Sequence, residues 1–171
     1  MDWTKALDYV QRAKAVGAER GVEVSVAIHD PAGHPVLVAR GKTTAWHGPY
    51  MAMGKARLAA AFRKPTADLC RQWEGRPMFA QSLTEIIPGG VTLNKGGYPL
   101  YENGQLIGAI GVGGIPPAER NATYGEELCA RDALEQVIGP QPPLLPDLAA
   151  QQRANPAGGG GRAGGRGAPN Q

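Results

Sequence analysis

Cysteine is scarce in the 171-residue sequence: only Cys70 and Cys129 are present, each within a predicted helix. Their spacing matches neither a zinc site nor a CxxC redox pair, so buried free thiols in a reducing compartment are the default interpretation. The sequence also lacks an apolar run near the roughly 20 residues that span a bilayer. Its first residues show no basic segment followed by an apolar one, as a signal peptide would. We therefore expect a cytoplasmic protein with no membrane partner.

Signatures of nucleotide, metal and hydrolase chemistry are also missing. The sequence contains no Walker loop and no HExxH, GxSxG or paired CxxC motif. The GxGG at residues 111–114 is not a dinucleotide fingerprint, because its strand belongs to a predicted hairpin rather than to a βαβ unit. The formal net charge is +3, but Arg153, Arg162 and Arg166 lie near the C-terminus, so residues 1–150 are close to neutral. A nucleic-acid partner for the domain is therefore not expected.

Large apolar side chains become sparse after residue 139, where Pro, Gly, Ala and Gln dominate. Such a segment cannot bury enough apolar surface to offset the entropy that is lost when it becomes ordered. We therefore predict a single domain over residues 1–139, followed by a disordered Pro/Gly-rich tail over residues 140–171.

The glycine-punctuated stretch 88–114 carries the clearest local signal. Asn103-Gly104 separates two apolar runs, and these residue types tolerate the positive φ angles of a type I′ turn. Residues 98–101 and 106–112 should therefore pair as an antiparallel hairpin. The second strand has so little polar character that we expect it to be central, with both faces covered. Its glycines have two interpretations: the close approach of a ligand, or the close packing of a helix.

The remaining elements follow from hydrophobic periodicity and turn residues. Apolar spacing predicts helices over 2–20, 47–62, 66–73 and 126–138, with a further helical piece near 78–84. Alternation predicts strands over 22–28 and 35–40, joined by a turn at 30–33, and a short apolar run predicts another strand over 91–93. This order predicts an α+β domain with an antiparallel sheet of about five strands flanked by helices.

Histidines are the first candidates for a functional site. His29, His34 and His47 are the only three in the chain, and all lie at the ends of early elements. Imidazole is a common metal ligand and titrates near neutral pH, so all three are candidate metal ligands, although a lone histidine is more often structural. His47 and Met51 are four residues apart on one helix face. That pair is suited either to ligating haem iron or to capping and packing the helix.

Further candidates lie on the middle helix and in the hairpin. Lys55 and Arg57 place cations where they can hold a ligand carboxylate or a haem propionate. Tyr98 is suited either to stacking on a planar ligand or to completing the core. The acidic residues show no spacing that is typical of a catalytic pair.

Residues 96–114, GGYPLYENGQLIGAIGVGG, resemble the signature of the GlcG/HbpS-like family, whose members are described as haem-degrading or haem-binding and include the C-terminal domain of PduO-type corrinoid adenosyltransferases. Lys55 lies in another motif of that family, whereas Leu58 and Gly113 replace its usual threonine and serine. The resemblance implies a profilin-like α/β/α sandwich, a haem or related cofactor, and homo-oligomers from dimers to octamers. A further family motif is matched by Ile28, Asp30, Gly33, His34 and Arg40.

Two functions remain open from the sequence, beside a purely structural oligomer. The first is the binding of haem or a related cofactor or metabolite in a pocket at the sheet edge. The second is an enzyme that acts on a small carboxylated or cyclic metabolite, with a histidine as acid or base and Lys55 or Arg57 holding the anion. Its candidate catalytic residues are His34, His47 and Lys55. For either function, the residues expected to contact the ligand are His29, His34, His47, Met51, Lys55, Arg57, Tyr98, Gly111, Gly113 and Gly114.

Overall fold

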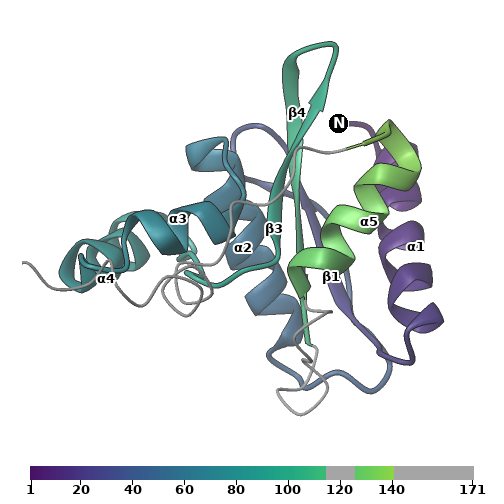
Figure 1. The fold of residues 1–171 in the computed structure, drawn as a ribbon, viewed down its shortest axis with the longest axis horizontal. Helices are drawn as coiled ribbons and strands as arrows, with labels where there is room; N and C mark the ends of the chain where they lie inside the picture. Colours follow the sequence, from purple (N-terminus) through teal and green to yellow (C-terminus); the bar gives the residue numbers. More distant parts are fainter. Residues whose placement is uncertain (115–125, 141–171) are drawn as a thin grey trace, which may run out of the picture.

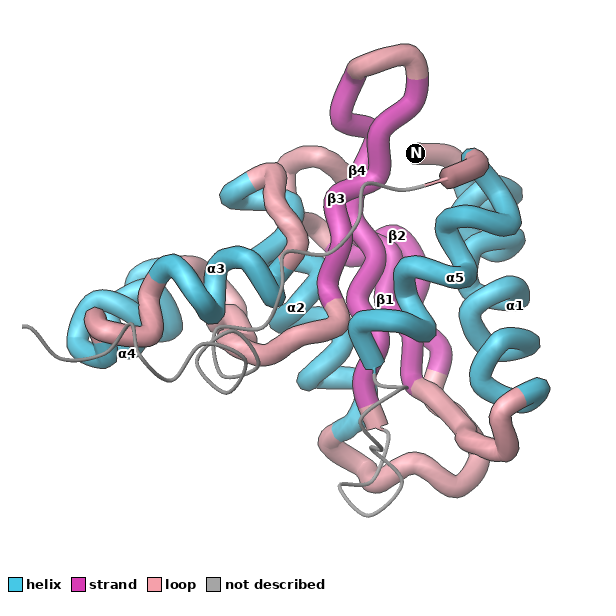
Figure 2. Tube along the Cα trace, in the orientation of Figure 1, coloured by secondary structure: helices cyan, strands magenta, loops and turns pink. Residues whose placement is uncertain are grey.

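The computed structural model of the protein describes residues 1–114 and 126–140. In this part of the chain, four strands form one antiparallel sheet in the order β2-β1-β4-β3, with helices on both faces (Figure 1, Figure 2). An α+β fold is thereby confirmed, whereas the predicted tail lies outside the described residues except for Pro140. The elements are α1 (Trp3–Glu19), β1 (Ser25–His29), β2 (Pro35–Ala39), α2 (Gly48–Phe62), α3 (Thr66–Gln72), α4 (Pro77–Ile86), β3 (Gly97–Glu102), β4 (Gln105–Gly113) and α5 (Glu126–Ile138).

Because the described residues form four strands, the prediction of about five was wrong. The missing strand is residues 91–93, which form a loop beside α2. Val91 is buried in a cluster with apolar side chains of α2 and α3. Thr92 lies so close to Gly54 of α2 that a Cβ added to this glycine would overlap the threonine hydroxyl. The segment therefore packs on helices and leaves β3 at the edge of the sheet.

The two faces of the sheet pack on different helices. Val26 and Ile28 of β1 join the main core beneath α1 and α5. Ala27, which points to the opposite face, packs on Ala52 and Ala56 of α2. Strand β4 lies between β1 and β3 and is buried along most of its length. The prediction of a central strand covered on both faces is confirmed.

Gly111 permits a close contact between β4 and α2. A Cβ at this position would overlap the carbonyl oxygen of Ala52 and lie 2.7 Å from the amide nitrogen of Ala56. At Gly113, a Cβ would lie 3.0 Å from the carbonyl oxygen of Gly48. Helix packing, rather than ligand approach, therefore explains the need for glycine at these two positions.

The β3–β4 hairpin has the predicted turn. Asn103 has a φ of 50° and Gly104 a φ of 76°, and the strand residues on either side, Glu102 and Gln105, face each other in the antiparallel register. Asparagine and glycine are the residues that adopt this backbone conformation at least cost. The hairpin predicted from this dipeptide is therefore confirmed.

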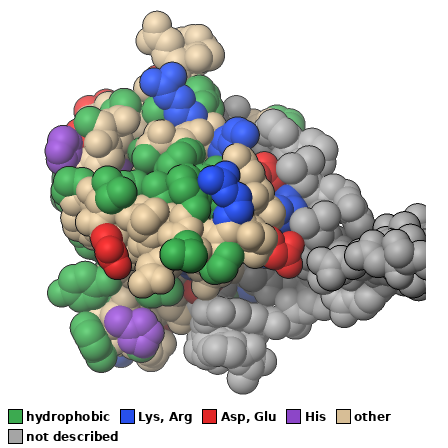
Figure 3. Space-filling view, turned by 90° about the vertical axis from the view of Figure 1, so that its left-hand side faces the viewer, with side chains coloured by type: hydrophobic (Ala, Val, Ile, Leu, Met, Phe, Trp, Pro, Cys, Tyr) green, Lys and Arg blue, Asp and Glu red, His purple; other side chains and the backbone are tan. Residues whose placement is uncertain are grey.

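Helices α3 and α4 extend to one side of the sheet (Figure 1). α4 contains no buried residue, although Phe79 and Leu83 pack against the cluster that contains Trp73. Met78 and Ile86 are 84% and 74% exposed. The face that Figure 3 shows combines apolar side chains with charges of both signs. Among the described residues, none of the helices has the length and apolar character needed to cross a membrane.

Candidate functional site

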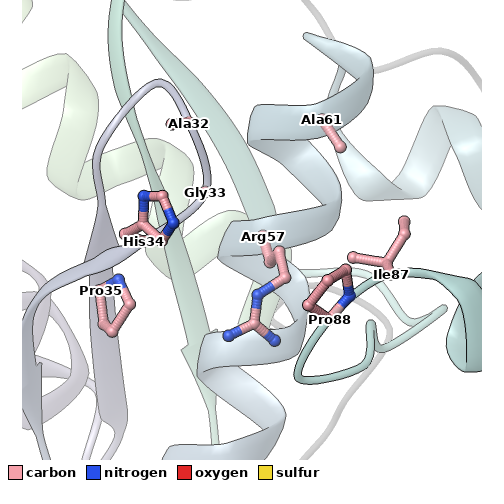
Figure 4. Close-up of a pocket in the computed structure, with 8 residues that line it drawn as sticks. All are labelled: Ala32, Gly33, His34, Pro35, Arg57, Ala61, Ile87 and Pro88. Carbon is pink, nitrogen blue, oxygen red and sulfur yellow. The ribbon is translucent and has the colours of Figure 1, made fainter.

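A pocket of about 210 Å³ lies between the β1–β2 turn and α2 (Figure 4). Its walls come from three segments: the turn, one side of α2, and the loop that follows α4. Among the residues that the sequence singled out as ligand contacts, His34 and Arg57 line this pocket. The complete lining is Ala32, Gly33, His34, Pro35, Arg57, Ala61, Ile87 and Pro88.

The β1–β2 turn is held by Asp30. Its Oδ1 accepts hydrogen bonds from the backbone N–H groups of Ala32 and His34, each at 2.9 Å. Gly33 has a φ of 86°, which glycine adopts readily. Burial opposes ionisation of Asp30, but the backbone hydrogen bonds outweigh it, so the pKa of this carboxyl lies below its usual value. The turn held by Asp30 therefore forms a fixed wall of the pocket.

His29 lies beneath this turn. Its Nδ1 is 2.8 Å from the carbonyl oxygen of Gly33; because a carbonyl only accepts, Nδ1 carries the proton and Nε2 keeps its lone pair. That Nε2 atom is buried and has no hydrogen-bond partner among the described residues. Burial lowers the pKa of His29, the hydrogen bond to Gly33 partly offsets this, and the nearby Arg57 cation lowers it further. The side chain is therefore a neutral hydrogen-bond acceptor near neutral pH.

The protein should lose stability as the pH falls from about 7 to about 5, and His29→Asn should lose less. Below about 6.5 the unfolded histidine binds a proton that the folded one, with its lowered pKa, does not bind. The unfolded state then holds more protons than the folded state, so the free energy of unfolding decreases as the pH decreases. Urea unfolding at both pH values measures this loss, with the exposed His34→Asn as control. If the free energy of unfolding of His29→Asn depended on pH as that of the wild type does, the lowered pKa of His29 would be contradicted.

Arg57 is the principal cation of the pocket. Its Nη1 donates hydrogen bonds to the carbonyl oxygens of Gly89 and Gly90, each at 2.6 Å. The other terminal nitrogen points away from Pro88, toward the side where Pro35 lies (Figure 4). Among the described residues, Arg57 forms no ion pair with a carboxylate, and its Nε and Nη2 groups have no hydrogen-bond acceptor. The pocket therefore presents positive charge and hydrogen-bond donors to a ligand.

Lys55, although only two residues away, faces the interior. Its side chain has no solvent exposure, and its Nζ lies 2.8 Å from the carbonyl oxygen of Val112 and 2.5 Å from Oε2 of Glu126. Oε1 of Glu126 accepts a hydrogen bond from the backbone N–H of Gly114 at 3.0 Å. These contacts join α2, β4 and the first residue of α5. The structure thus places Lys55 and Gly114 in a buried network apart from the Arg57 pocket.

His47 lies at the opposite end of β1 from His29. The helix that follows it begins at Gly48, which contacts Ser25, the first residue of β1, whereas His29 is the last. His47 is exposed and makes an edge-on contact with Trp46, at 5.7 Å between ring centroids. The three histidines are therefore not brought together. In the described residues, no three His, Cys, Asp or Glu side chains are grouped to hold a metal ion.

Met51 and Tyr98 also lie away from the Arg57 pocket. The Cβ of Met51 is near Gly113, at the same end of the sheet as His47. Tyr98 is 4% exposed and packs in the core on the α1 and α5 face. The sequence indicated neither Ala61 nor the wall formed by Ile87 and Pro88, because that wall depends on how the loop after α4 folds back toward α2. The Pro88-Gly89-Gly90 turn sequence was the one available signal.

Comparison with known proteins identifies the family. The model of the haem-degrading HbpS-like family matches residues 1–128, and the chain belongs to this family. This agrees with the resemblance that the motif at residues 96–114 indicated. Family membership alone does not name the ligand, because a shared fold can serve different sites.

Individual relatives agree with this assignment. GlcG of Escherichia coli (strain K12) is 35% identical over 92 residues, which are 52% of this chain and 63% of GlcG, so the match spans less than two thirds of that relative. A crystal structure of a double mutant of Streptomyces reticuli HbpS has a TM-score of 0.67 and 25% identity, covering 80% of this chain and 86% of that one. The crystal structure of a PduOC:haem complex also has a TM-score of 0.67; at 22% identity, covering 81% and 95% of the two chains, it shows a shared fold.

The residues of the Arg57 pocket fit part of a haem molecule. A guanidinium is the usual partner of a carboxylate such as a propionate, and His34, whose side chain is 78% exposed, offers an imidazole beside it. The volume of about 210 Å³ is below the roughly 300 Å³ at which pockets for drug-sized ligands begin. The pocket can therefore hold a propionate arm but not a whole macrocycle.

Proposed function

We propose that the protein binds haem or a related carboxylate-bearing small molecule, and that a carboxylate of the ligand binds Arg57. The observation that carries this proposal is a pocket cation that no carboxylate neutralises among the described residues. A guanidinium in this state attracts an anion, and two parallel N–H donors match the two oxygens of a carboxylate. Membership of the HbpS-like family supports a small-molecule ligand and makes haem the first candidate.

In a haem complex, this chain's residues would have separate roles. Arg57 would hold one propionate within the pocket, while the exposed His34 would be available as an iron ligand, since haem iron accepts histidine. His29 does not line the pocket and its Nε2 is buried, so this atom is not placed to ligate the iron of a haem whose macrocycle stays outside the pocket. Haem, when bound, supplies the redox and ligand-exchange chemistry of its iron; the protein supplies the anchor and the imidazole.

Haemin should bind to the wild-type protein with a change in its Soret band. Arg57→Ala should weaken this binding about tenfold or more, because a hydrogen bond to a charged group contributes about 1.5–3 kcal/mol. His34→Ala should remove the spectral signature of histidine ligation. His47→Ala, a variant of an exposed histidine at the other end of the sheet, serves as the matched control and should titrate like the wild type. Titrations in which Arg57→Ala is indistinguishable from wild type would contradict the proposal.

An enzyme that acts on the same ligand is the second candidate. Oδ2 of Asp30 lies 3.5 Å from Nδ1 of His34, and a carboxylate in this position can orient an imidazole that transfers protons. Consumption of a bound carboxylic acid by the wild type, but not by His34→Gln, would favour this function over binding alone.

We also propose self-association. Met78 and Ile86 of α4, Trp46 just before α2 and Tyr50 in the first turn of α2 are large apolar side chains exposed on the surface. Exposed apolar side chains of this size favour burial against another protein surface. Sedimentation of the protein as a single monomeric species in analytical ultracentrifugation would exclude self-association.

A further inference from the structure

The guanidinium of Arg57 is oriented by the loop after α4. Both Gly89 and Gly90 accept from Nη1 at 2.6 Å, and both have positive φ angles, 78° and 69°, that turn their carbonyl groups toward the helix. A planar guanidinium fixed along one edge has its remaining N–H donors in a defined direction. One edge is therefore used by the protein, and the edge formed by Nε and Nη2 is available to one bidentate ligand group.

The charge of the pocket matches a single negative group. Asp30 is the nearest carboxylate on the turn, but its Oδ1 already accepts from two backbone N–H groups and its Oδ2 lies beside His34. Among the described residues, it forms no ion pair with Arg57. A ligand with one carboxylate would balance the one arginine charge, whereas a second carboxylate would find no second guanidinium among the described lining residues.

The rest of the lining is apolar and leaves little space. Apart from Arg57, His34 and the backbone of Gly33, the walls consist of alanine, proline and isoleucine side chains, at positions 32, 35, 61, 87 and 88. Apolar walls favour an apolar ligand body, and burying an unpaired second charge against them is unfavourable. The volume of about 210 Å³ limits that body to a short aliphatic chain or a single ring.

We infer that the Arg57 pocket selects a small monocarboxylate with an apolar body, its carboxylate paired with the Nε and Nη2 edge of Arg57. This inference rests on the proposed function and narrows it to a ligand class. Under it, haem enters the pocket only through a propionate arm, and the ligand that fills the pocket is a small carboxylic acid.

Isothermal titration calorimetry with four probes tests the inference on the full chain. Benzoate should bind. Benzamide, which has the same shape without the charge, terephthalate, which adds a second carboxylate, and inorganic phosphate should each bind about tenfold more weakly or worse. Phosphate binding as tightly as benzoate would overturn the inference, because the site would then be a general anion site. Equal binding of benzoate and terephthalate would overturn it as well.

Three variants separate the contributions of charge and shape. Arg57→Lys keeps the cation but loses the planar pair of donors, so the Kd for benzoate should rise about tenfold or more. Ala61→Leu places a good helix former at an exposed lining position and should block benzoate without changing the charge. Arg63→Lys, at the exposed end of the same helix, is the matched control and should bind benzoate like the wild type.

Failure of this inference can be told from failure of the proposed function. If haemin binding depends on Arg57 but benzoate does not bind to the wild type, the inferred ligand class is wrong, whereas the proposal that Arg57 binds a carboxylate of haem is supported. If neither haemin binding nor benzoate binding is weakened by Arg57→Ala, both proposals are wrong. If benzoate binding is lost in Arg57→Lys and in Ala61→Leu but kept in Arg63→Lys, the inference holds.

Discussion

Lys55→Met should lower the free energy of unfolding by about 3–5 kcal/mol, the range for removing one partner of a buried ion pair. The Nζ of Lys55 is buried and contacts both Glu126 and the carbonyl oxygen of Val112. Methionine fills a similar volume but removes the Lys55 cation from the Glu126 carboxylate, itself 6% exposed. Removing one partner of a buried ion pair is costly, and this pair lies where α2, β4 and α5 meet.

Urea unfolding of a double-mutant cycle measures the effect. In Lys55→Met/Glu126→Gln the Glu126 carboxylate charge is removed as well, so the double variant should be more stable than Lys55→Met alone. Glutamine retains an oxygen that can accept from the N–H of Gly114. Lys64→Met, at an exposed position just beyond the same helix, is the control and should change stability by less than about 0.5 kcal/mol. A loss below about 1 kcal/mol for Lys55→Met would show that the pair is not buried as described.

Gly111→Ala should destabilise the protein by about 3 kcal/mol, at the upper end of the usual cost of overpacking a core. The added Cβ would overlap the carbonyl oxygen of Ala52 and lie 2.7 Å from the amide nitrogen of Ala56. Both atoms belong to the backbone of α2, so a change of side-chain rotamer cannot relieve the contact. The helix must move away from the sheet, and the alanine cluster between them would lose its packing.

Gly75→Ala is the matched control, because a Cβ at that position would have nothing within 4 Å. It should be neutral or slightly stabilising, since alanine restricts the unfolded chain more than glycine does. Thermal and urea unfolding of both variants provide the comparison. Similar stabilities for Gly111→Ala and Gly75→Ala would contradict the close approach of β4 and α2.

Much of the fold was predictable because local chemistry agrees with the final packing. The Asn103-Gly104 turn and the apolar strand 106–112 each carry a signal that tertiary contacts do not override. The strand predicted at 91–93 failed for a physical reason: Val91 is apolar because it packs on α2 and α3, not because it pairs in the sheet. A three-residue apolar run does not distinguish these two environments.

The site was less accessible to sequence reasoning. The structure brings His34 and Arg57 to one pocket and sets His47 at the far end of β1. Proximity along the chain suggested that the three histidines gather, but a five-residue strand separates its two ends by about 13 Å. Lys55 and Arg57 lie two residues apart on one helix and so point in different directions. Which of them faces solvent depends on the position of Glu126, far along the chain.

The most direct test of the carboxylate anchor is a ¹⁵N NMR titration of the arginine side-chain Nε–H groups with benzoate. A saturable shift of the Arg57 resonance, with the resonance of Arg63 unchanged, is the predicted result, because the Nε edge of Arg57 is available in the pocket whereas its Nη1 is held by the loop. Resonances of Arg57 and Arg63 that respond alike, or an Arg57 resonance that does not respond, would contradict the account.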